Sequence, residues 1–246
     1  HLRSLYLSMP ANSGQTDTSM CSEHRQSLKA IIFDFDGVIL ESVDIKTHAF
    51  RELFKDYPQF IDKIVRLHLE NGGMSRFEKF QIIYHDYLDL SLGQDELERL
   101  GRKFSHLVYR RILDCPYVPG ARQFLQARAK QYSLFVASGT PQKELLDIVR
   151  QRGLDEFFDG VYGSPRSKNE ILRMILAENC LPAGQAVFLG DALGDCLSAR
   201  DVCMPFIGRV AKGNPVSFPG DSVMGVVENL KQLDQQWDSL VMQFSE

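Results

Sequence analysis

Short apolar runs alternate with longer amphipathic segments along this chain. The run at 30–35 has no polar alternation, which predicts a strand buried on both faces of a parallel sheet. Similar runs predict further strands at 133–138, 160–163, 186–190 and 205–208. The segments between the later runs place apolar residues three and four positions apart, as in helices that pack on a sheet. Strand alternating with helix at this spacing indicates an α/β fold built on a parallel sheet.

The segment between the first two predicted strands differs, because it has helical periodicity only. It predicts one helix from Val43, a second at 60–70, a third from Ser75 and a fourth at 94–113. Ser75 is followed three residues later by Glu78, the pattern of a capping box. Helices of these lengths can form a small bundle of their own.

We therefore expect two domains and a tail. Residues 28–42 and 116–246 form a Rossmann-like core flanked by helices, and residues 43–115 form an inserted α-helical bundle. Residues 1–27, rich in Ser, Thr, Asn and Gln, are expected to be a poorly ordered tail. After a Gly- and Pro-rich loop that reaches Gly220, a final helix beginning near Val227 should pack on the core.

Composition and charge narrow the class of partner. With 246 residues and 44% hydrophobic content, the chain can bury a full core. The net charge of -4 and the absence of a Lys/Arg-rich block argue against nucleic acid or an anionic membrane as partner. The five cysteines are scattered without a Cys-x-x-Cys pair, and no apolar stretch approaches the roughly 20 residues of a membrane helix. We expect a cytoplasmic protein with reduced thiols, either a monomer or a homodimer.

Polar residues stand where the predicted strands end. The carboxyl ends of parallel strands share one edge of the sheet, which is where open α/β sheets bind ligands. The residues expected at this edge are Asp34, Asp36, Ser138, Lys168, Asp191 and Asp195. Crowded carboxylates need a cation or a shared proton, and oxygen ligands without nearby His or Cys favour Mg²⁺. The alternative for the first pair is a solvated Asp-x-Asp-Gly turn.

With these residues in place, the chain resembles the haloacid dehalogenase superfamily, in its phosphatase and phosphomutase branch. That branch includes phosphoglycolate phosphatase-like and beta-phosphoglucomutase-like proteins. Asp34-Phe-Asp36-Gly37 is similar to the first family motif, Ser138 to the second and Lys168 to the third. The fourth motif is matched by the segment from Gly190 to Asp195. The helical insertion falls where the family has its helical cap.

The resemblance implies a role for each matching residue. Asp34 would attack phosphorus and become an aspartyl-phosphate, and Asp36 would act as general acid and base. Mg²⁺ would be held by Asp34, the backbone carbonyl of Asp36, Asp191 and, through water or as an orienting residue, Asp195. Phosphate would be bound by Ser138, Gly139 and Lys168.

The expected function is therefore a Mg²⁺-dependent phosphatase that hydrolyses a small phosphorylated metabolite. A sugar phosphomutase would use the same residues, and a catalytically idle phospho-ligand binding protein is an alternative of another class. Arg76 and Lys79, which follow a Gly-Gly loop in the insertion, are candidates for contact with the substrate. Glu41, Asn169 and Ala192 depart from common family residues without altering the chemistry.

Overall fold

The computed structural model describes residues 27–214, 216–220 and 223–244. The tail expected at 1–27 lies outside this part except for its last residue. The strands are β1 Ala30–Phe33, β2 Ser133–Pro141, β3 Gly160–Ser164, β4 Ala186–Gly190, β5 Phe206–Arg209 and β6 Val223–Val227. They form a 6-stranded sheet in the order β3-β2-β1-β4-β5-β6, and every pairing is parallel. The predicted α/β fold class is confirmed.

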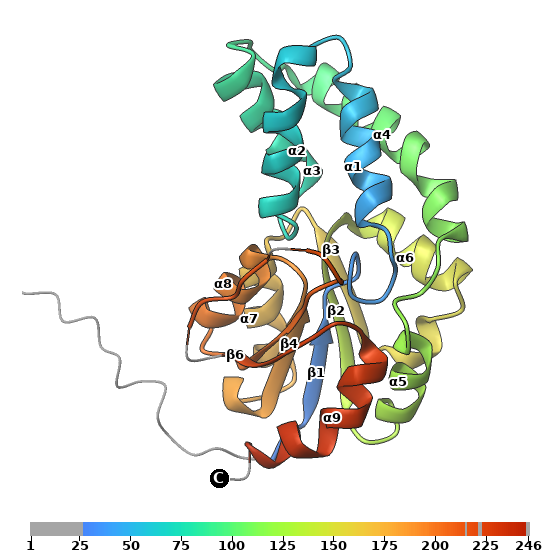
Figure 1. Cartoon of the computed structure of the whole chain (residues 1–246), viewed down its shortest axis with the longest axis vertical. Coiled ribbons are helices and arrows are strands. Elements are labelled where there is room, and N and C mark those ends of the chain that lie inside the picture. Colours follow the sequence, from blue (N-terminus) through green and yellow to red (C-terminus); the bar gives the residue numbers. More distant parts are fainter. Residues whose placement is uncertain (1–26, 215, 221–222, 245–246) are drawn as a thin grey trace, which may run out of the picture.

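Helices cover both faces of the sheet (Figure 1). They are α5 Ala121–Arg128, α6 Gln142–Gln151, α7 Lys168–Glu178, α8 Leu193–Asp201 and α9 Leu230–Met242. Side chains alternate along β1, so Ile31 and Phe33 pack with α5, α6 and α9, whereas Ala30 and Ile32 pack with α7 and α8. Both faces of the central strand are thus buried, which is why its sequence is a continuous apolar run.

The segment between β1 and β2 forms a group of helices beyond the carboxyl ends of the strands (Figure 1). We call this group, α1 Val43–Leu53, α2 Ile61–Glu70, α3 Arg76–Ile82 and α4 Gln94–Asp114, the helical insertion. Aromatic rings join these helices, and the centroids of Phe50 and Phe104 are 4.9 Å apart. Ser75 and Glu78 form the predicted capping box at the start of α3. None of the helices within the described ranges is long and apolar enough to span a membrane.

Irregular turns join several of these elements. Single 3₁₀ turns lie at Pro58–Phe60, Asp155–Phe157 and Ala183–Gln185, and a π-helical turn at Ile83–Tyr87 extends α3.

The carboxyl-terminal part of the sheet departs from expectation. The prediction missed β6 and was wrong to assign Val227 to the final helix, which begins at Leu230. β6 is an edge strand with little burial, so its apolar residues could not be told apart from those of the next helix. β2 also extends to Pro141, beyond the predicted end at residue 138.

Candidate active site

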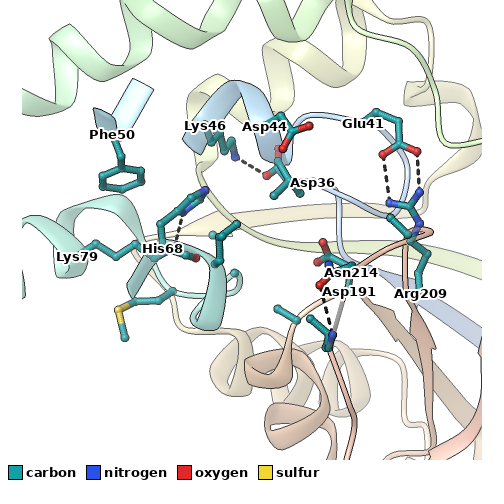
Figure 2. Close-up of a pocket in the computed structure, with 18 of the residues that line it drawn as sticks. Asp36, Glu41, Asp44, Lys46, Phe50, His68, Lys79, Asp191, Arg209 and Asn214 are labelled. Carbon is teal, nitrogen blue, oxygen red and sulfur yellow. Dashed lines mark hydrogen bonds and ion pairs between the residues drawn. The ribbon is translucent and has the colours of Figure 1, made fainter. Parts of the chain in front are cut away.

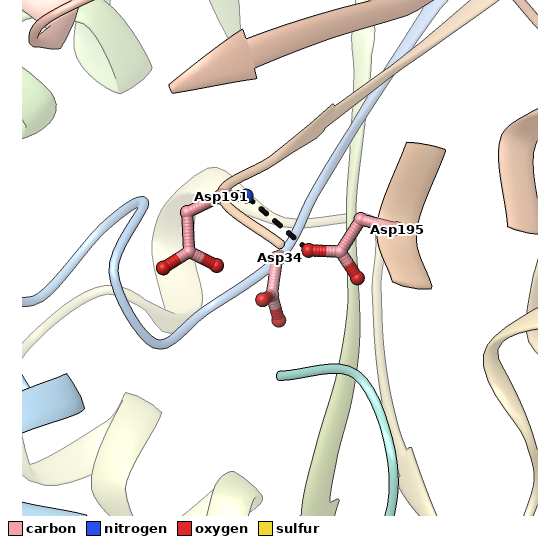
Figure 3. A group of neighbouring side chains, drawn as sticks. All are labelled: Asp34, Asp191 and Asp195. Atoms are coloured by element: carbon pink, nitrogen blue, oxygen red, sulfur yellow. Dashed lines mark hydrogen bonds between the residues drawn. The ribbon is translucent and has the colours of Figure 1, made fainter. Parts of the chain in front are cut away.

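Three carboxylates meet at the carboxyl edge of the sheet. Asp34 directly follows β1, Asp191 follows β4, and Asp195 lies in the first turn of α8. One oxygen from each lies within 4.8 Å of the others, around a single small space (Figure 3). Asp34 is 3% exposed and Asp195 is fully buried, whereas Asp191 is partly exposed and opens to a cavity. The structure therefore brings these three carboxylates together at the sheet edge, as expected.

Lys168 provides the positive charge of the cluster. It is the first residue of α7, where Ser167 caps the helix by accepting a hydrogen bond from the Glu170 backbone N–H. Its Nζ lies 3.0 Å from Asp34 Oδ2 and also bonds to Asp195 Oδ1. Burial alone would lower the pKa of Lys168, but the two carboxylates outweigh burial and raise it. Lys168 is therefore a permanent ammonium.

The carboxylates remain crowded despite this lysine. Burial raises the pKa of Asp34 well above its usual value, and the neighbouring aspartates add to the shift. Burial, followed by the Asp195 charge, raises the pKa of Asp191 to about 7. A divalent cation would relieve this repulsion, and a donor set made only of carboxylate oxygens suits Mg²⁺. The residues present therefore fit the expected metal.

Gly37 lets the backbone approach this cluster closely. Its φ is +76°, and a Cβ added there would lie 2.0 Å from Asp191 Oδ2. The Arg209 guanidinium donates to the Gly37 carbonyl at 3.1 Å and pairs with both oxygens of Glu41, at 2.6 and 3.1 Å. Arg209, at the end of β5, therefore holds the turn after β1 in place through these hydrogen bonds.

Asp195 has both of its oxygens engaged. Oδ1 bonds to Lys168, and Oδ2 accepts the backbone N–H groups of Asp191 and Ala192, each at 3.2 Å. These contacts support the role of an orienting residue, one of the two roles that the sequence analysis left open.

Asp36 is held apart from the cluster by a set of donors that the sequence analysis missed. Ser42 Oγ donates to its Oδ1 at 2.6 Å, and Thr140 Oγ1 donates to its Oδ2 at 3.1 Å. Lys46 Nζ bonds to Oδ2 and donates to Thr140 Oγ1 at 2.8 Å. Burial alone would raise the pKa of Asp36, but the Lys46 ammonium and the hydrogen bonds lower it to about 2.

A signal for Lys46 was present in the sequence. It stands three and four residues before Ala49 and Phe50, on the apolar face of the first predicted helix. A lysine on such a face needs a polar partner, and Asp36 is ten residues earlier.

The helical insertion reaches the site through the loop between α2 and α3. A Cβ added at Gly73 would lie 2.9 Å from Asp195 Oδ1, and one added at Gly139 would lie 3.0 Å from the Gly73 carbonyl oxygen. Ser138, the last residue of the continuous buried run in β2, is fully buried and accepts the Thr140 backbone N–H at 3.1 Å. The predicted phosphate-binding residues therefore lie at this edge, directly beneath the loop.

A cavity of about 410 Å³ lies between the helical insertion and the sheet edge. Asp36 and Asp191 line one end, whereas Phe50, His68 and Lys79 line the other (Figure 2). This volume suits a small metabolite. His68 is only 6% exposed, because α2 turns it toward this cavity.

The two candidate substrate residues of the insertion differ in their contacts. Arg76 pairs with Glu144 of α6, with N–O distances of 2.6 and 3.1 Å, and donates to Ser105 Oγ at 2.9 Å. Its donors are thus engaged by protein groups, which does not support substrate binding by Arg76 in this conformation. Lys79 is 2% exposed and contacts only uncharged atoms of His68 by hydrogen bonds, so it remains a candidate.

The comparisons with known proteins agree with this geometry. Residues 31–209 match the model of the haloacid dehalogenase-like hydrolase family. A phosphoglycolate phosphatase from Vibrio cholerae is 27% identical over 74% of this chain and 84% of its own. A phosphorylated carbohydrates phosphatase from Thermotoga maritima is 28% identical over 65% of this chain and 76% of its own.

Among solved structures, a beta-phosphoglucomutase from Clostridium difficile has the same fold. The two structures superpose with a TM-score of 0.69 at 18% sequence identity, and the match covers 88% of this chain and 98% of the beta-phosphoglucomutase chain. Because the family model spans most of the chain, from the first predicted strand to the end of β5, the predicted family is confirmed. The chain belongs to the haloacid dehalogenase-like hydrolase family.

Proposed function

We propose that this protein is a Mg²⁺-dependent phosphatase that hydrolyses a small phosphomonoester through an aspartyl-phosphate on Asp34. One observation carries the proposal: the Asp34 carboxylate is buried beside the Lys168 ammonium, at 3.0 Å, and within the carboxylate cluster at the cavity. An aspartate so placed can meet a phosphoryl group whose charge is neutralised nearby. The named phosphatase relatives support the same chemistry.

The proposed reaction has two steps. In the first, an Asp34 oxygen bonds to phosphorus as the bond to the leaving oxygen breaks, and Asp36 transfers a proton to that oxygen. Asp36 can hold this proton only after substrate binding has displaced the Lys46 ammonium, because that contact lowers the pKa of Asp36 to about 2 in this structure. In the second, a water attacks the aspartyl-phosphate and gives its proton to Asp36. Phosphate leaves, and the Asp34 carboxylate is restored. The Asp36 contacts to Ser42, Lys46 and Thr140 hold its carboxyl group in place between these steps.

The other residues neutralise and orient the phosphoryl group. Ser138 and the backbone at Gly139, with Lys168, would bind its oxygens, while Asp195 keeps Lys168 in position. Mg²⁺ would be held by Asp34, Asp191 and the Asp36 carbonyl, and its charge would offset the repulsion between carboxylate and phosphate. The helical insertion, residues 43–115, would act as a cap that excludes water.

Hydrolysis of p-nitrophenyl phosphate tests the proposal. We expect Asp34→Asn to lower turnover by about 10³-fold or more, because an amide cannot form the phosphorylated intermediate. Asp238→Asn, an exposed change on α9, is the matched control and should retain activity. Unaffected hydrolysis in Asp34→Asn would reject the mechanism. Phosphate release measured against isomer formation separates a phosphatase from the phosphomutase alternative.

A further inference from the structure

The end of the cavity away from Asp191 contains a buried lysine without a counterion. Lys79, in α3, is 2% exposed and faces the cavity together with His68 and Phe50 (Figure 2). Its Nζ lies 3.2 Å from His68 Nδ1 and 3.3 Å from the His68 carbonyl oxygen. Neither partner is negatively charged, and no carboxylate among the described residues pairs with Lys79. Two contacts also leave one of its three N–H donors unused.

Burying the Lys79 side chain without an anionic partner costs free energy of folding. Burial, then the charges of Lys46 and Lys168, lowers the pKa of Lys79 to about 7. The carboxylates of Asp36 and Asp34 oppose this shift, but Asp36 is paired with Lys46 and Asp34 with Lys168. Within the described residues, therefore, no unpaired carboxylate is available to the Lys79 ammonium. An anion entering the cavity would remove the cost.

His68 supplies a second unused donor at the same place. Burial and the Lys79 charge hold its pKa well below the usual value, although the Val43 backbone opposes the shift. The ring is therefore neutral, and because Nδ1 accepts from Lys79, Nε2 carries the proton. Nε2 is buried and has no hydrogen bond of normal geometry within the described residues, its one polar neighbour being the Val43 backbone that acts on the pKa of the ring. A buried N–H group in this state would be stabilised by a hydrogen-bond acceptor on a bound ligand.

The cavity that contains these donors extends to the edge of the phosphoryl site, since Asp36, Gly139 and Asp191 line it together with His68 and Lys79. We propose that the substrate carries a second anionic group, a carboxylate or a second phosphate, which Lys79 and His68 bind while its phosphoryl group lies at Asp34. This inference rests on the proposed phosphatase function and adds the substrate class to it. Phe50 and Met74, which also line the cavity, leave room for a short carbon chain between the two ends.

Matched substrate pairs test the inference on the unmodified protein. 2-Phosphoglycolate is compared with 2-hydroxyethyl phosphate, and fructose 1,6-bisphosphate with fructose 6-phosphate, so each pair differs in the second anion. A hydrogen-bonded ion pair is expected to give the anionic member of at least one pair a kcat/KM about 10- to 100-fold higher. The pair that shows the preference identifies the anion as a carboxylate or a phosphate. Equal kcat/KM within both pairs would overturn the inference.

A variant assigns the preference to Lys79. We expect Lys79→Met to lower the kcat/KM ratio between the preferred anionic substrate and p-nitrophenyl phosphate by about tenfold or more. Lys103→Met removes an exposed lysine of α4 and should leave that ratio unchanged. A parallel loss on all substrates in Lys79→Met would overturn the inference while leaving the phosphatase proposal intact. Failure of the phosphatase proposal would appear separately, as p-nitrophenyl phosphate hydrolysis that survives Asp34→Asn.

Discussion

Buried charged residues at the sheet edge are the feature on which the site depends. Asp34, Lys168 and Asp195 are each less than 5% exposed, and folding must remove all three from water. Their mutual contacts offset part of that cost, and the remaining repulsion between carboxylates is what makes the site receptive to a cation. Such residues are retained for what they bind rather than for stability.

Gly37→Ala tests the close approach of the β1 turn to this site. The variant would place a methyl group 2.0 Å from Asp191 Oδ2 at a φ of +76°, so the carboxylate must move. We expect p-nitrophenyl phosphate turnover to fall by about 100-fold, because a displacement of about 1 Å in a site can cost that much. Steady-state kinetics, with circular dichroism as a check of folding, measures this.

The matched control is Gly184→Ala. An added Cβ there meets nothing within 4 Å, so turnover should equal that of the parent protein. If Gly37→Ala and Gly184→Ala were equally active, the turn after β1 would not position Asp191.

The buried Lys79 predicts a pH dependence of stability. Its folded pKa of about 7 lies below its unfolded value of 10.5, so the unfolded chain binds more protons between these values. Lys79 therefore opposes folding most strongly below pH 7, and its contribution to the free energy of unfolding improves by about 1 kcal/mol per pH unit above pH 7. The charges of Lys46, Lys168, Asp36 and Asp34 also act on the pKa of this ammonium, and His68 contacts it directly.

Comparison with Lys79→Met isolates this contribution from other titrating groups. Urea unfolding at pH 6 should show Lys79→Met to be more stable than the parent, with the difference shrinking as pH rises toward 10. A difference that is constant with pH would mean that Lys79 keeps an ordinary pKa in the folded protein.

At the scale of elements, the sequence pattern predicted well those elements whose burial or capping is set by neighbouring residues. The prediction of Ala186–Gly190 as a strand is confirmed residue for residue, because this run is buried on both sides. The capping box at Ser75 likewise fixed the start of α3. The sequence pattern did not predict β6, because an edge strand needs less apolar sequence than a central one. Its pairing with β5 also cannot be inferred from neighbouring residues.

A buried ion pair that no sequence pattern indicated links α3 to α6. The Arg76 and Glu144 side chains are 4% and 11% exposed, and the guanidinium also lies 4.5 Å from the centre of the Phe104 ring. We expect Arg76→Met to lower the free energy of unfolding by about 3 kcal/mol, because it leaves the Glu144 carboxylate buried without a cation. Urea unfolding measures the change.

A second substitution separates pairing from packing. In Arg76→Met with Glu144→Met no unpaired charge remains, so most of the lost stability should return. Additive losses in the double variant would show that the two side chains do not act as a pair.

At the scale of the whole molecule, the site is made by two parts of the chain. The sheet edge provides the carboxylates and Lys168, while the helical insertion provides Lys46, the Gly73 loop and the proposed second anion site. A substrate held between them would complete the enclosure, in keeping with a cap that closes on binding.

The proposed metal site gives a prediction for the complete protein. Chelator should lower p-nitrophenyl phosphate turnover by about 100-fold or more, and Mg²⁺ should restore it, because the carboxylate cluster needs a cation. Mg²⁺ at 100 times its Kd should also raise Tm by about 5 °C, through preferential binding to the folded state.

Asp191→Asn tests whether the rise in Tm comes from Mg²⁺ bound at the carboxylate cluster. With one proposed ligand removed, the rise in Tm on adding Mg²⁺ should shrink or vanish. Full turnover in chelator, or a Tm of the parent protein that ignores Mg²⁺, would contradict the metal assignment.

The sequence by itself determined the order of strands and helices and the chemical groups at the ends of the strands. Hydrophobic period and turn chemistry are properties of near neighbours, and the parallel topology then brings Asp34, Lys168 and Asp191 to one edge. Only the tertiary structure decided which groups face each other across long separations. The contacts of Asp36 with Thr140, of Arg76 with Glu144, and of Lys79 with the cavity depend on how the insertion packs above the sheet, and local pattern does not encode that packing.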